Sequence, residues 1–243
     1  MKAIETKNLT KRYGEITALD GLDLAVSQGE LVALLGINGA GKTTAIKILS
    51  GLTLPDVGEA WLGGHSILDE AQNFKRVIGV SPQETAIAKK LTVRENLQFI
   101  AEIHGLNATE AAERVEFALK EFGLNEITKR RAGTLSGGWQ RRLSIAMALI
   151  SKPQILFLDE PTLGLDVIAR HELWEQIRTL KGRITILLTT HYLEEVEALC
   201  DRVAILSSGK LVAIGTVTQI KALAGKESFE EAFVTLCAGG GQI

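Results

Sequence analysis

The feature that most constrains this chain is a glycine-rich loop between two apolar runs. The first run, residues 31–35, reads as a buried strand and stops abruptly at Gly36. The second run, at Ile46, Leu49 and Leu52, recurs at helical spacing. The residues between them match the pattern G-x-x-x-x-G-K-[ST]. A strand, such a loop and a helix in this order predict an α/β fold that binds a phosphate group.

The residue types of the loop suit a purine nucleoside triphosphate. Its glycines allow the backbone to curl so that N–H groups face a phosphate, and the following helix points its positive end at the same place. Lys42 adds a positive charge for the β- and γ-phosphates, while Thr43 offers a hydroxyl to Mg²⁺. The residues expected to hold the nucleotide phosphates are Gly36, Asn38, Gly39, Ala40, Gly41, Lys42, Thr43 and Thr44.

Size, charge and apolar content narrow the class of protein. A chain of 243 residues suffices for one large α/β domain or for a core with a smaller insertion. A net charge of −2 gives no overall attraction to nucleic acid, and we expect none as a partner. No apolar run approaches the roughly 18 residues of a membrane span, and the N-terminus lacks the apolar segment of a signal peptide. With only Cys200 and Cys237, which form no disulfide framework, we expect a soluble, cytoplasmic protein.

Polar side chains follow three further apolar strands. Gln83 comes after the run VIGVSP, Asp159 and Glu160 end the run ILFLDE, and His191 ends the run ITILLTTH. Ligands bind beyond the carboxyl ends of strands in open α/β sheets, so these groups are candidates for the nucleotide site. The first carboxylate suits Mg²⁺ through a water, and the second can orient or deprotonate an attacking water. Taken alone, Gln83 is compatible with a turn, and His191 with either a turn cap or a γ-phosphate contact.

The remaining segments divide into strand-like and helical parts. Alternating residues over 1–28 predict two antiparallel strands, and 58–81 carries more short strand signals. Residues 91–150 have helical periodicity instead, with a capping-box pattern at Thr92 and Glu95. We also expect a helix over 167–180, a hairpin turning at 208–209, helices near 216–224 and 228–236, and a disordered tail from residue 239.

A second glycine-rich helix start lies inside the helical part. Ser136 is a natural N-cap, and Gly137 and Gly138 leave the first N–H groups of the helix open. The pattern fits a second anion-binding helix start, and it also fits an ordinary capped helix with a flexible entry.

Taken in order, these motifs resemble the ATP-binding subunit of an ABC transporter over residues 2 to about 218. The resemblance rests on 36–43, Gln83, Leu135-Ser136-Gly137-Gly138, 155–160, Leu165-Asp166 and His191. It implies a P-loop NTPase fold with a RecA-like, mostly parallel core, an N-terminal antiparallel β subdomain and an α-helical subdomain inserted at about 88–150. Residues 1–218 would form the ATPase domain, and 219–243 a short C-terminal helical extension with a flexible tail.

The resemblance also implies a role for each site residue near the first helix start. Tyr13 looks like the aromatic residue that stacks on adenine. Asp159 would support Mg²⁺, Glu160 would polarise the attacking water, and His191 would reach the γ-phosphate. Gln83 looks like the residue that touches both the metal and the water and senses a membrane partner.

The resemblance also implies a function for the second helix start. Ser136, Gly137 and Gly138 would bind the γ-phosphate of ATP held by another subunit, and Asp166 would couple the two sites. A head-to-tail dimer, of two identical or two paired ATPases, then explains two anion-binding helix starts in one chain. The sequence departs from the family pattern at Trp139, where glutamine is commonest, and we expect nucleotide binding to survive there with local contacts altered. It also departs around Leu163, Gly164 and Val167, where we expect no consequence for hydrolysis.

The resemblance extends to a subgroup. The segments 188–206, 209–217 and 228–236 look like ATPases paired with ABC-2-type exporters, and the chain stops where many importer ATPases add a regulatory domain. We therefore expect ATP-driven transport, in the direction of export, through a separate integral membrane permease that docks against residues 83–105 and the helices after them. The subunit would lie peripherally on the inner face of the cell membrane.

Two other functions use the same loop. A non-transport ABC ATPase acting as a soluble assembly factor is compatible with the length, whereas the DNA-repair and translation types need long insertions or two ATPase units. A small-molecule kinase would have no use for the Ser-Gly-Gly helix or for Glu160 beside Asp159.

Overall fold

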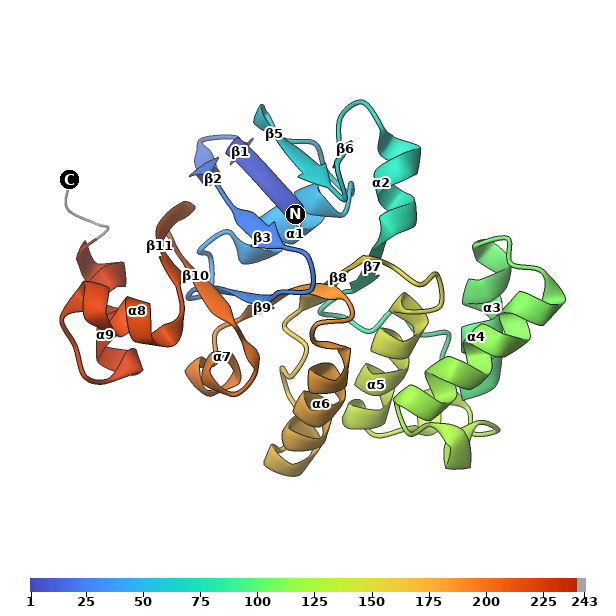
Figure 1. Cartoon of the computed structure of the whole chain (residues 1–243). Helices are drawn as coiled ribbons and strands as arrows, with labels where there is room; N and C mark the ends of the chain where they lie inside the picture. Colours follow the sequence, from blue (N-terminus) through green and yellow to red (C-terminus); the bar gives the residue numbers. More distant parts are fainter. Residues whose placement is uncertain (240–243) are drawn as a thin grey trace.

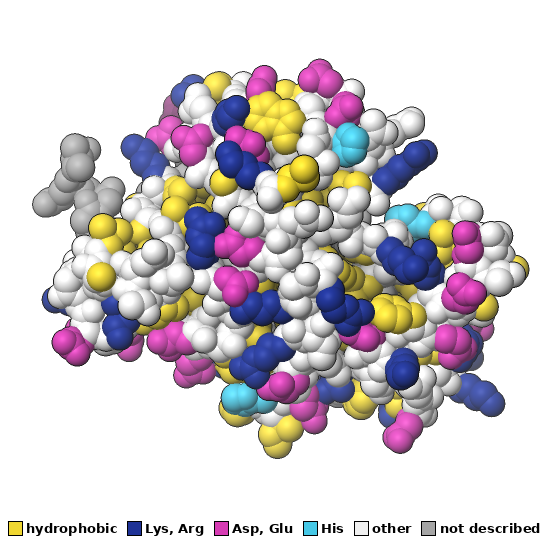
Figure 2. Space-filling view, viewed as in Figure 1, with side chains coloured by type: hydrophobic (Ala, Val, Ile, Leu, Met, Phe, Trp, Pro, Cys, Tyr) yellow, Lys and Arg dark blue, Asp and Glu magenta, His cyan; other side chains and the backbone are white. Residues whose placement is uncertain are grey.

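The computed structural model describes residues 1–239, and residues 240–243, most of the tail expected to be disordered, lie outside the described residues. Figure 1 shows a small antiparallel sheet packed above a larger central sheet, with helices below and at both sides. Lysine and arginine are interspersed with aspartate and glutamate over the face seen in Figure 2, in keeping with the balanced composition of 27 basic and 29 acidic residues.

The central sheet carries the glycine-rich loop. Its strands are β4 (Leu31–Leu35), β7 (Ile78–Ser81), β8 (Ile155–Asp159), β9 (Thr185–Thr190), β10 (Arg202–Ser207) and β11 (Lys210–Gly215). They lie in the order β11-β10-β4-β9-β8-β7, and all neighbours are parallel except β11, which pairs antiparallel with β10. Every residue of β4, β8 and β9 is buried, which explains why these strands read as continuous apolar runs. The predicted mostly parallel core is confirmed.

The second sheet is antiparallel and mostly N-terminal. Its strands are β1 (Lys2–Tyr13), β2 (Ile16–Leu22), β3 (Ala25–Ser27), β5 (Val57–Leu62) and β6 (His65–Ser66). The first 28 residues form three strands, so the expectation of two was wrong. The long β1 pairs with β3 through Lys2–Glu5 and with β2 through Leu9–Tyr13, and Asn8 between them has a positive φ of 49°. This kink lets one edge of β1 pair with two strands, while β5 pairs along its other edge.

Helices cover the central sheet and extend from it. They are α1 (Lys42–Leu49), α2 (Ala71–Val77), α3 (Val93–Ile103), α4 (Ala108–Glu121), α5 (Gly137–Ala148), α6 (Val167–Leu180), α7 (Leu193–Leu199), α8 (Val217–Ala224) and α9 (Phe229–Gly239), with 3-10 turns at Asn125–Ile127 and Ala132–Thr134. In Figure 1, α3 and α4 project to one side of the sheet, and α8 and α9 lie at the other. Within residues 1–239, none of the helices has the length and apolar character needed to cross a bilayer.

Two helical details differ from the sequence predictions. Helix α2 occupies part of a segment expected to be extended, because Phe74 is buried and anchors this short helix against the antiparallel sheet. On α1 the inner face is formed by Ile46, Ile48 and Leu49, whereas Leu52 lies beyond the helix and is exposed. The other helices occupy the predicted segments to within a few residues.

The central sheet separates two apolar cores. Alternate side chains of β4 point to opposite faces: Leu31, Ala33 and Leu35 pack with the helices from α3 onward, while Val32 and Leu34 pack with α1 and the antiparallel sheet. The strand that delivers the loop is therefore fixed from both sides. Burial on both faces holds the carboxyl ends of the parallel strands in one rigid row.

Candidate nucleotide-binding site

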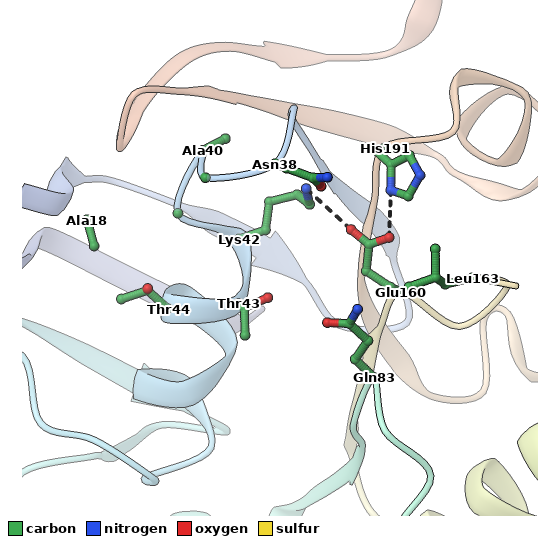
Figure 3. A pocket seen from close by; sticks show the side chains of 12 residues that line it. Ala18, Asn38, Ala40, Lys42, Thr43, Thr44, Gln83, Glu160, Leu163 and His191 are labelled. Atoms are coloured by element: carbon green, nitrogen blue, oxygen red, sulfur yellow. Dashed lines mark ion pairs between the residues drawn. The ribbon is translucent and has the colours of Figure 1, made fainter.

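A cavity of about 410 Å³ lies at the loop between β4 and α1. It is lined by Ala18, Asn38, Gly39, Ala40, Gly41, Lys42, Thr43, Thr44, Gln83, Glu160, Leu163 and His191. The carboxyl ends of the neighbouring strands β7, β8 and β9 thus bring Gln83, Glu160 and His191 to the predicted phosphate loop, as Figure 3 shows. No sequence pattern predicted that Ala18, which reaches the cavity from β2, or Leu163, three residues after Glu160, would line this site.

The loop has a shape that only glycine permits at two positions. Gly41 has a φ of 105°, and a Cβ atom there would lie 2.4 Å from the carbonyl oxygen of Ala18. A Cβ atom on Gly36 would lie 2.6 Å from the carbonyl oxygen of Leu206. The loop backbone, without Cβ atoms at these positions, therefore forms a cradle that packs closely against neighbouring segments of the chain. A phosphate can approach the N–H groups of the loop in this cradle.

Lys42 is held at the cavity by the loop itself. Its side chain is buried, and Nζ donates hydrogen bonds to the carbonyl oxygens of Gly36 (2.7 Å) and Ile37 (3.2 Å). The same Nζ lies 3.3 Å from Oε1 of Glu160. A positive charge is thus fixed at the start of α1, where the helix already presents the positive end of its dipole.

Glu160 projects into the cavity between Lys42 and His191, as Figure 3 shows. Its backbone has a φ of 48°, a strained conformation for a residue with a side chain, and its N–H donates to Oγ1 of Thr189 at 2.9 Å. Oε2 lies 2.6 Å from Nδ1 of His191, but the two buried atoms lack the alignment of a hydrogen bond. Neither atom therefore has a hydrogen-bond partner among the described residues.

Asp159 lies one residue earlier, beneath the cavity rather than on its surface. Its carboxylate is buried and accepts a hydrogen bond from Oγ1 of Thr189 at 2.5 Å. Burial raises the pKa of Asp159, and the Thr189 hydrogen bond and the charge of Lys42 oppose that rise. Within residues 1–239, no cluster of three or more His, Cys, Asp or Glu side chains could hold a metal alone. A Mg²⁺ ion here needs the Thr43 hydroxyl, waters and phosphate oxygens as further ligands, which is the oxygen-rich set that Mg²⁺ prefers.

Gln83 reaches the cavity from the end of β7. Figure 3 shows its side-chain amide pointing toward the space between Thr43 and Glu160. Thr43, Gln83, Glu160 and His191 thus meet at one cavity, although they come from positions spread over residues 43–191 of the sequence.

Tyr13 does not line this cavity. It stands at the end of β1 with 48% of its surface exposed, and Nζ of Lys11 lies 5.7 Å from the centre of its ring. Stacking on adenine remains a prediction for this residue. Its exposed ring stands on the strand that pairs with β2, which supplies Ala18 to the cavity wall.

The second glycine-rich helix start lies outside the cavity. Ser136 occupies the N-cap position of α5 as predicted, yet its side chain makes no capping hydrogen bond, and Ser136 and Gly137 are both exposed. Asp166 also lies outside the cavity, and its carboxylate caps α6 by accepting a hydrogen bond from the N–H of Ala169 at 2.8 Å. A Cβ atom on Gly138 would lie 3.1 Å from the Cβ of Ala169, so the starts of α5 and α6 adjoin.

Trp139, the departure from the family pattern, turns toward the protein. The ring packs at the edge of the helical core, with the guanidinium of Arg142 4.6 Å from its centre. Arg142 in turn pairs with Glu172 of α6. Arg142 therefore links α5 to α6 through Glu172 while it stacks on the indole of Trp139.

The chain is similar to a large set of known proteins. A family model described as "ABC transporter" matches residues 19–163. A daunorubicin resistance ATP-binding protein of Streptomyces coeruleorubidus is 42% identical over 229 residues, covering 94% of this chain and 72% of that protein. A Nod factor export ATP-binding protein I of Burkholderia thailandensis is 45% identical over 214 residues, covering 87% and 70%.

Solved structures agree with these relatives. An ATP-binding subunit of an ABC transporter superposes with a TM-score of 0.86 at 33% identity, covering 96% of this chain and 99% of that one. A dimeric ATP-binding cassette in a post-hydrolysis state, bound to ADP and Pi, superposes with a TM-score of 0.78 at 27% identity, covering 88% and 98%.

Proposed function

The chain belongs to the ABC transporter family, whose ATP-binding subunits are ATPases, and we propose that it powers export through a separate membrane permease of the ABC-2 type. The observation that carries the ATPase chemistry is the convergence of Lys42, Glu160 and His191 on one cavity at the glycine-rich loop. Export is supported by relatives named for drug resistance and for Nod factor export. A soluble assembly factor is not favoured, because these relatives are named for resistance and export instead.

In this proposal the loop from Gly36 to Thr44, which includes Lys42, binds the phosphates of ATP. The glycine cradle of the loop and the ammonium group of Lys42, held by the Gly36 carbonyl, are both suited to binding a chain of phosphates. Mg²⁺ would be held by Thr43 and Gln83, with Asp159 acting through a water, and when bound it would neutralise phosphate charge. Tyr13 would stack on the adenine from its exposed position on β1.

Glu160 and His191 would carry the hydrolytic step. The carboxylate of Glu160 orients a water molecule by accepting its hydrogen bond, and the water oxygen attacks the γ-phosphorus. The bond from the γ-phosphorus to the β–γ bridging oxygen breaks, which leaves ADP and inorganic phosphate. His191 contacts the γ-phosphate, and Lys42 stabilises the charge that develops on the transferred group.

The second helix start would complete the site of another subunit. Ser136, Gly137 and Gly138 would bind the γ-phosphate of ATP held by a partner, with Asp166 at the same interface. The exposure of Ser136 and its unused hydroxyl support this arrangement, as does a solved relative that is dimeric with ADP and Pi. We propose a head-to-tail dimer, either of two copies or with a paired ATPase, in which each ATP is held by both chains.

The domain boundaries belong to the same proposal. Residues 1–218 would form the ATPase domain with the helical subdomain at about 88–150, and 219–243 would be a C-terminal extension. The membrane permease would dock against residues 83–105 and hold the subunit peripherally on the inner face of the cell membrane. Exposed apolar side chains at Phe99 (48%) and Ile103 (63%) support a contact on this part of the chain.

A pull-down from gently detergent-solubilised membranes tests the transport proposal. The tagged chain is expected to co-purify with a membrane protein of several spans, identified by mass spectrometry, and to retain ATPase activity. A matched Phe99→Glu/Ile103→Glu variant should keep that activity and lose the membrane protein, because charge is placed on the proposed docking surface. Recovery of soluble partners alone, with the ATPase intact, would favour the assembly-factor function.

A further inference from the structure

Arg141 is a buried cation that reaches from α5 to the segment carrying Gln83. It lies in the second turn of α5 and is only 5% exposed. Nη1 donates a hydrogen bond to the carbonyl oxygen of Pro82 at 2.6 Å, and Nη2 donates to the carbonyl oxygen of Gln83 at 2.5 Å. One planar guanidinium thus donates hydrogen bonds to the carbonyl oxygens of two successive residues directly after β7.

The surroundings of Arg141 are acidic. Asp159 and Glu195, both buried, lie close enough for their negative charges to favour the charged guanidinium, whereas burial lowers the pKa of Arg141. A buried guanidinium is costly unless it is hydrogen-bonded, and here two carbonyl oxygens accept its hydrogen bonds while the negative charges of Asp159 and Glu195 favour the charged form. The position of this side chain is therefore tightly determined.

Gln83 is fixed at its backbone and free at its side chain. The residue is exposed and its amide faces the cavity, while its carbonyl oxygen is held by Arg141 from behind. The next residues, 84–92, contain no regular element before α3. Without the guanidinium, the peptide of Gln83 would have more conformations available, and its side chain would spend less time directed at the reacting groups.

We propose that Arg141 is a positioning residue for ATP hydrolysis, which fixes the Pro82–Gln83 backbone so that the Gln83 amide faces Mg²⁺ and the attacking water. The inference rests on the proposed function, because it needs Gln83 to act at the nucleotide. It assigns no contact between Arg141 and ATP. Lysine cannot replace the guanidinium here, because one ammonium is a point charge and does not match two adjacent carbonyl groups as a planar fork does.

Ser144 offers a matched control on the same helix. Its hydroxyl lies 2.9 Å from Oγ of Ser81, the last residue of β7, and both side chains are buried. Ser144→Ala therefore removes a polar contact between α5 and β7 without touching the peptide of Gln83. Any effect that arises from looser packing of α5 on β7 should appear in both variants.

The experiment compares wild type, Arg141→Lys and Ser144→Ala in steady-state phosphate release, with ATP and Mg²⁺ titrated separately. Arg141→Lys should lower kcat about tenfold and raise the Mg²⁺ concentration for half-maximal rate, while KM for ATP stays within about twofold. Ser144→Ala should change kcat by less than about twofold. In a Gln83→Ala background, Arg141→Lys should lower kcat by no more than about twofold further, because its target is gone.

Limited proteolysis gives a readout that does not depend on turnover. Cleavage after the exposed Glu84 by a glutamate-specific protease should be about tenfold faster in Arg141→Lys than in wild type, and at the wild-type rate in Ser144→Ala. Unchanged cleavage in Arg141→Lys, or equal losses of kcat with and without Gln83, would overturn the inference. A wild-type chain without ATPase activity would instead contradict the proposed function, and the proteolysis experiment would still decide whether Arg141 fixes this segment.

Discussion

The starts of α1 and α5 share one property and differ in another. Neither has a capping side-chain hydrogen bond or an acidic residue in its first turn. Among the helices of eight or more residues within 1–239, the others have one or both; α3 and α4, for example, begin with complete capping boxes. A helix start without an internal acceptor leaves its N–H groups and its positive dipole end available to an external anion.

The difference lies in how far each start is enclosed. The start of α1 opens into a cavity with a buried lysine and polar groups from three other strands. The start of α5 is exposed, and Ser136 contributes an unused hydroxyl. One chain therefore contains an enclosed candidate anion site at the start of α1 and an open one, without a surrounding cavity, at the start of α5. We interpret the second as half of a site that another chain completes.

The largest expected effect is on ATP binding, and it should differ between the glycine-rich starts of α1 and α5. Gly41→Ala should weaken ATP binding by at least about 100-fold, because the new Cβ would meet the Ala18 carbonyl at 2.4 Å and the backbone requires a positive φ. Gly137→Ala is the control, because its Cβ would meet only Leu165 at 3.8 Å, and single-chain ATP binding should stay unchanged. Titration with a fluorescent ATP analogue measures both. Wild-type affinity in Gly41→Ala would show that the cradle is not the phosphate site.

The next effect tests whether the enclosed site performs the chemistry. Glu160→Gln should reduce phosphate release by about 10²- to 10⁴-fold and leave ATP binding intact, because the water loses its carboxylate partner. The same variant should form a dimer with ATP and remain a monomer with ADP, since the exposed start of α5 needs a γ-phosphate to bind. Light scattering compares the two masses. Turnover at the wild-type rate would remove Glu160 from the mechanism, and equal masses in both nucleotides would contradict a shared site.

A smaller effect addresses the exposed start alone. In the Glu160→Gln background, Ser136→Ala should raise the dimer dissociation constant with ATP by about tenfold, the amount expected for loss of one hydrogen bond to a charged group. Thr134→Ala, which removes a nearby exposed hydroxyl that already donates to the Arg131 carbonyl, should leave the dissociation constant unchanged. Analytical ultracentrifugation measures both variants. An equal effect of the two substitutions would mean that Ser136 has no specific role in the interface.

The smallest effect compares two helix caps by stability. Thr92→Ala should lower the free energy of unfolding by about 1 kcal/mol, because Thr92 accepts a hydrogen bond from the N–H of Glu95 in the capping box of α3. Ser136→Ala should change it by less than about 0.5 kcal/mol, because no capping bond is lost. Urea unfolding of the single chain measures the two values. A loss near that of Thr92→Ala at Ser136 would indicate a structural cap rather than a ligand site.

Local signals in the sequence predicted the elements that carry the site. The spacing of Gly36, Gly41 and Lys42 fixed the loop, because a positive φ and a backbone without Cβ are required within a few residues of each other. The capping box of α3, predicted at Thr92 and Glu95, is equally local, since its two reciprocal bonds join residues three apart. The continuous apolar runs predicted buried strands, and the complete burial of β4, β8 and β9 confirms them.

Other features depended on neighbours that are distant in sequence. Nothing within the first 28 residues indicates that β1 bends at Asn8 to pair with two strands, and nothing near residue 71 predicts α2, which forms because Phe74 is buried against the antiparallel sheet. Likewise, Arg141 resembles any arginine on a helix until the fold places it against the Gln83 carbonyl.

The sequence by itself therefore determined which functional groups are available to this protein, and the tertiary structure decided where those groups come together. Backbone conformation and periodicity are set by interactions over a few residues, so the phosphate loop and the helix starts can be predicted locally. The distances from Gln83, Glu160 and His191 to Lys42 follow from β7, β8, β9 and β4 lying side by side. That order is fixed by burial on both faces of the central sheet, which involves most of the chain at once.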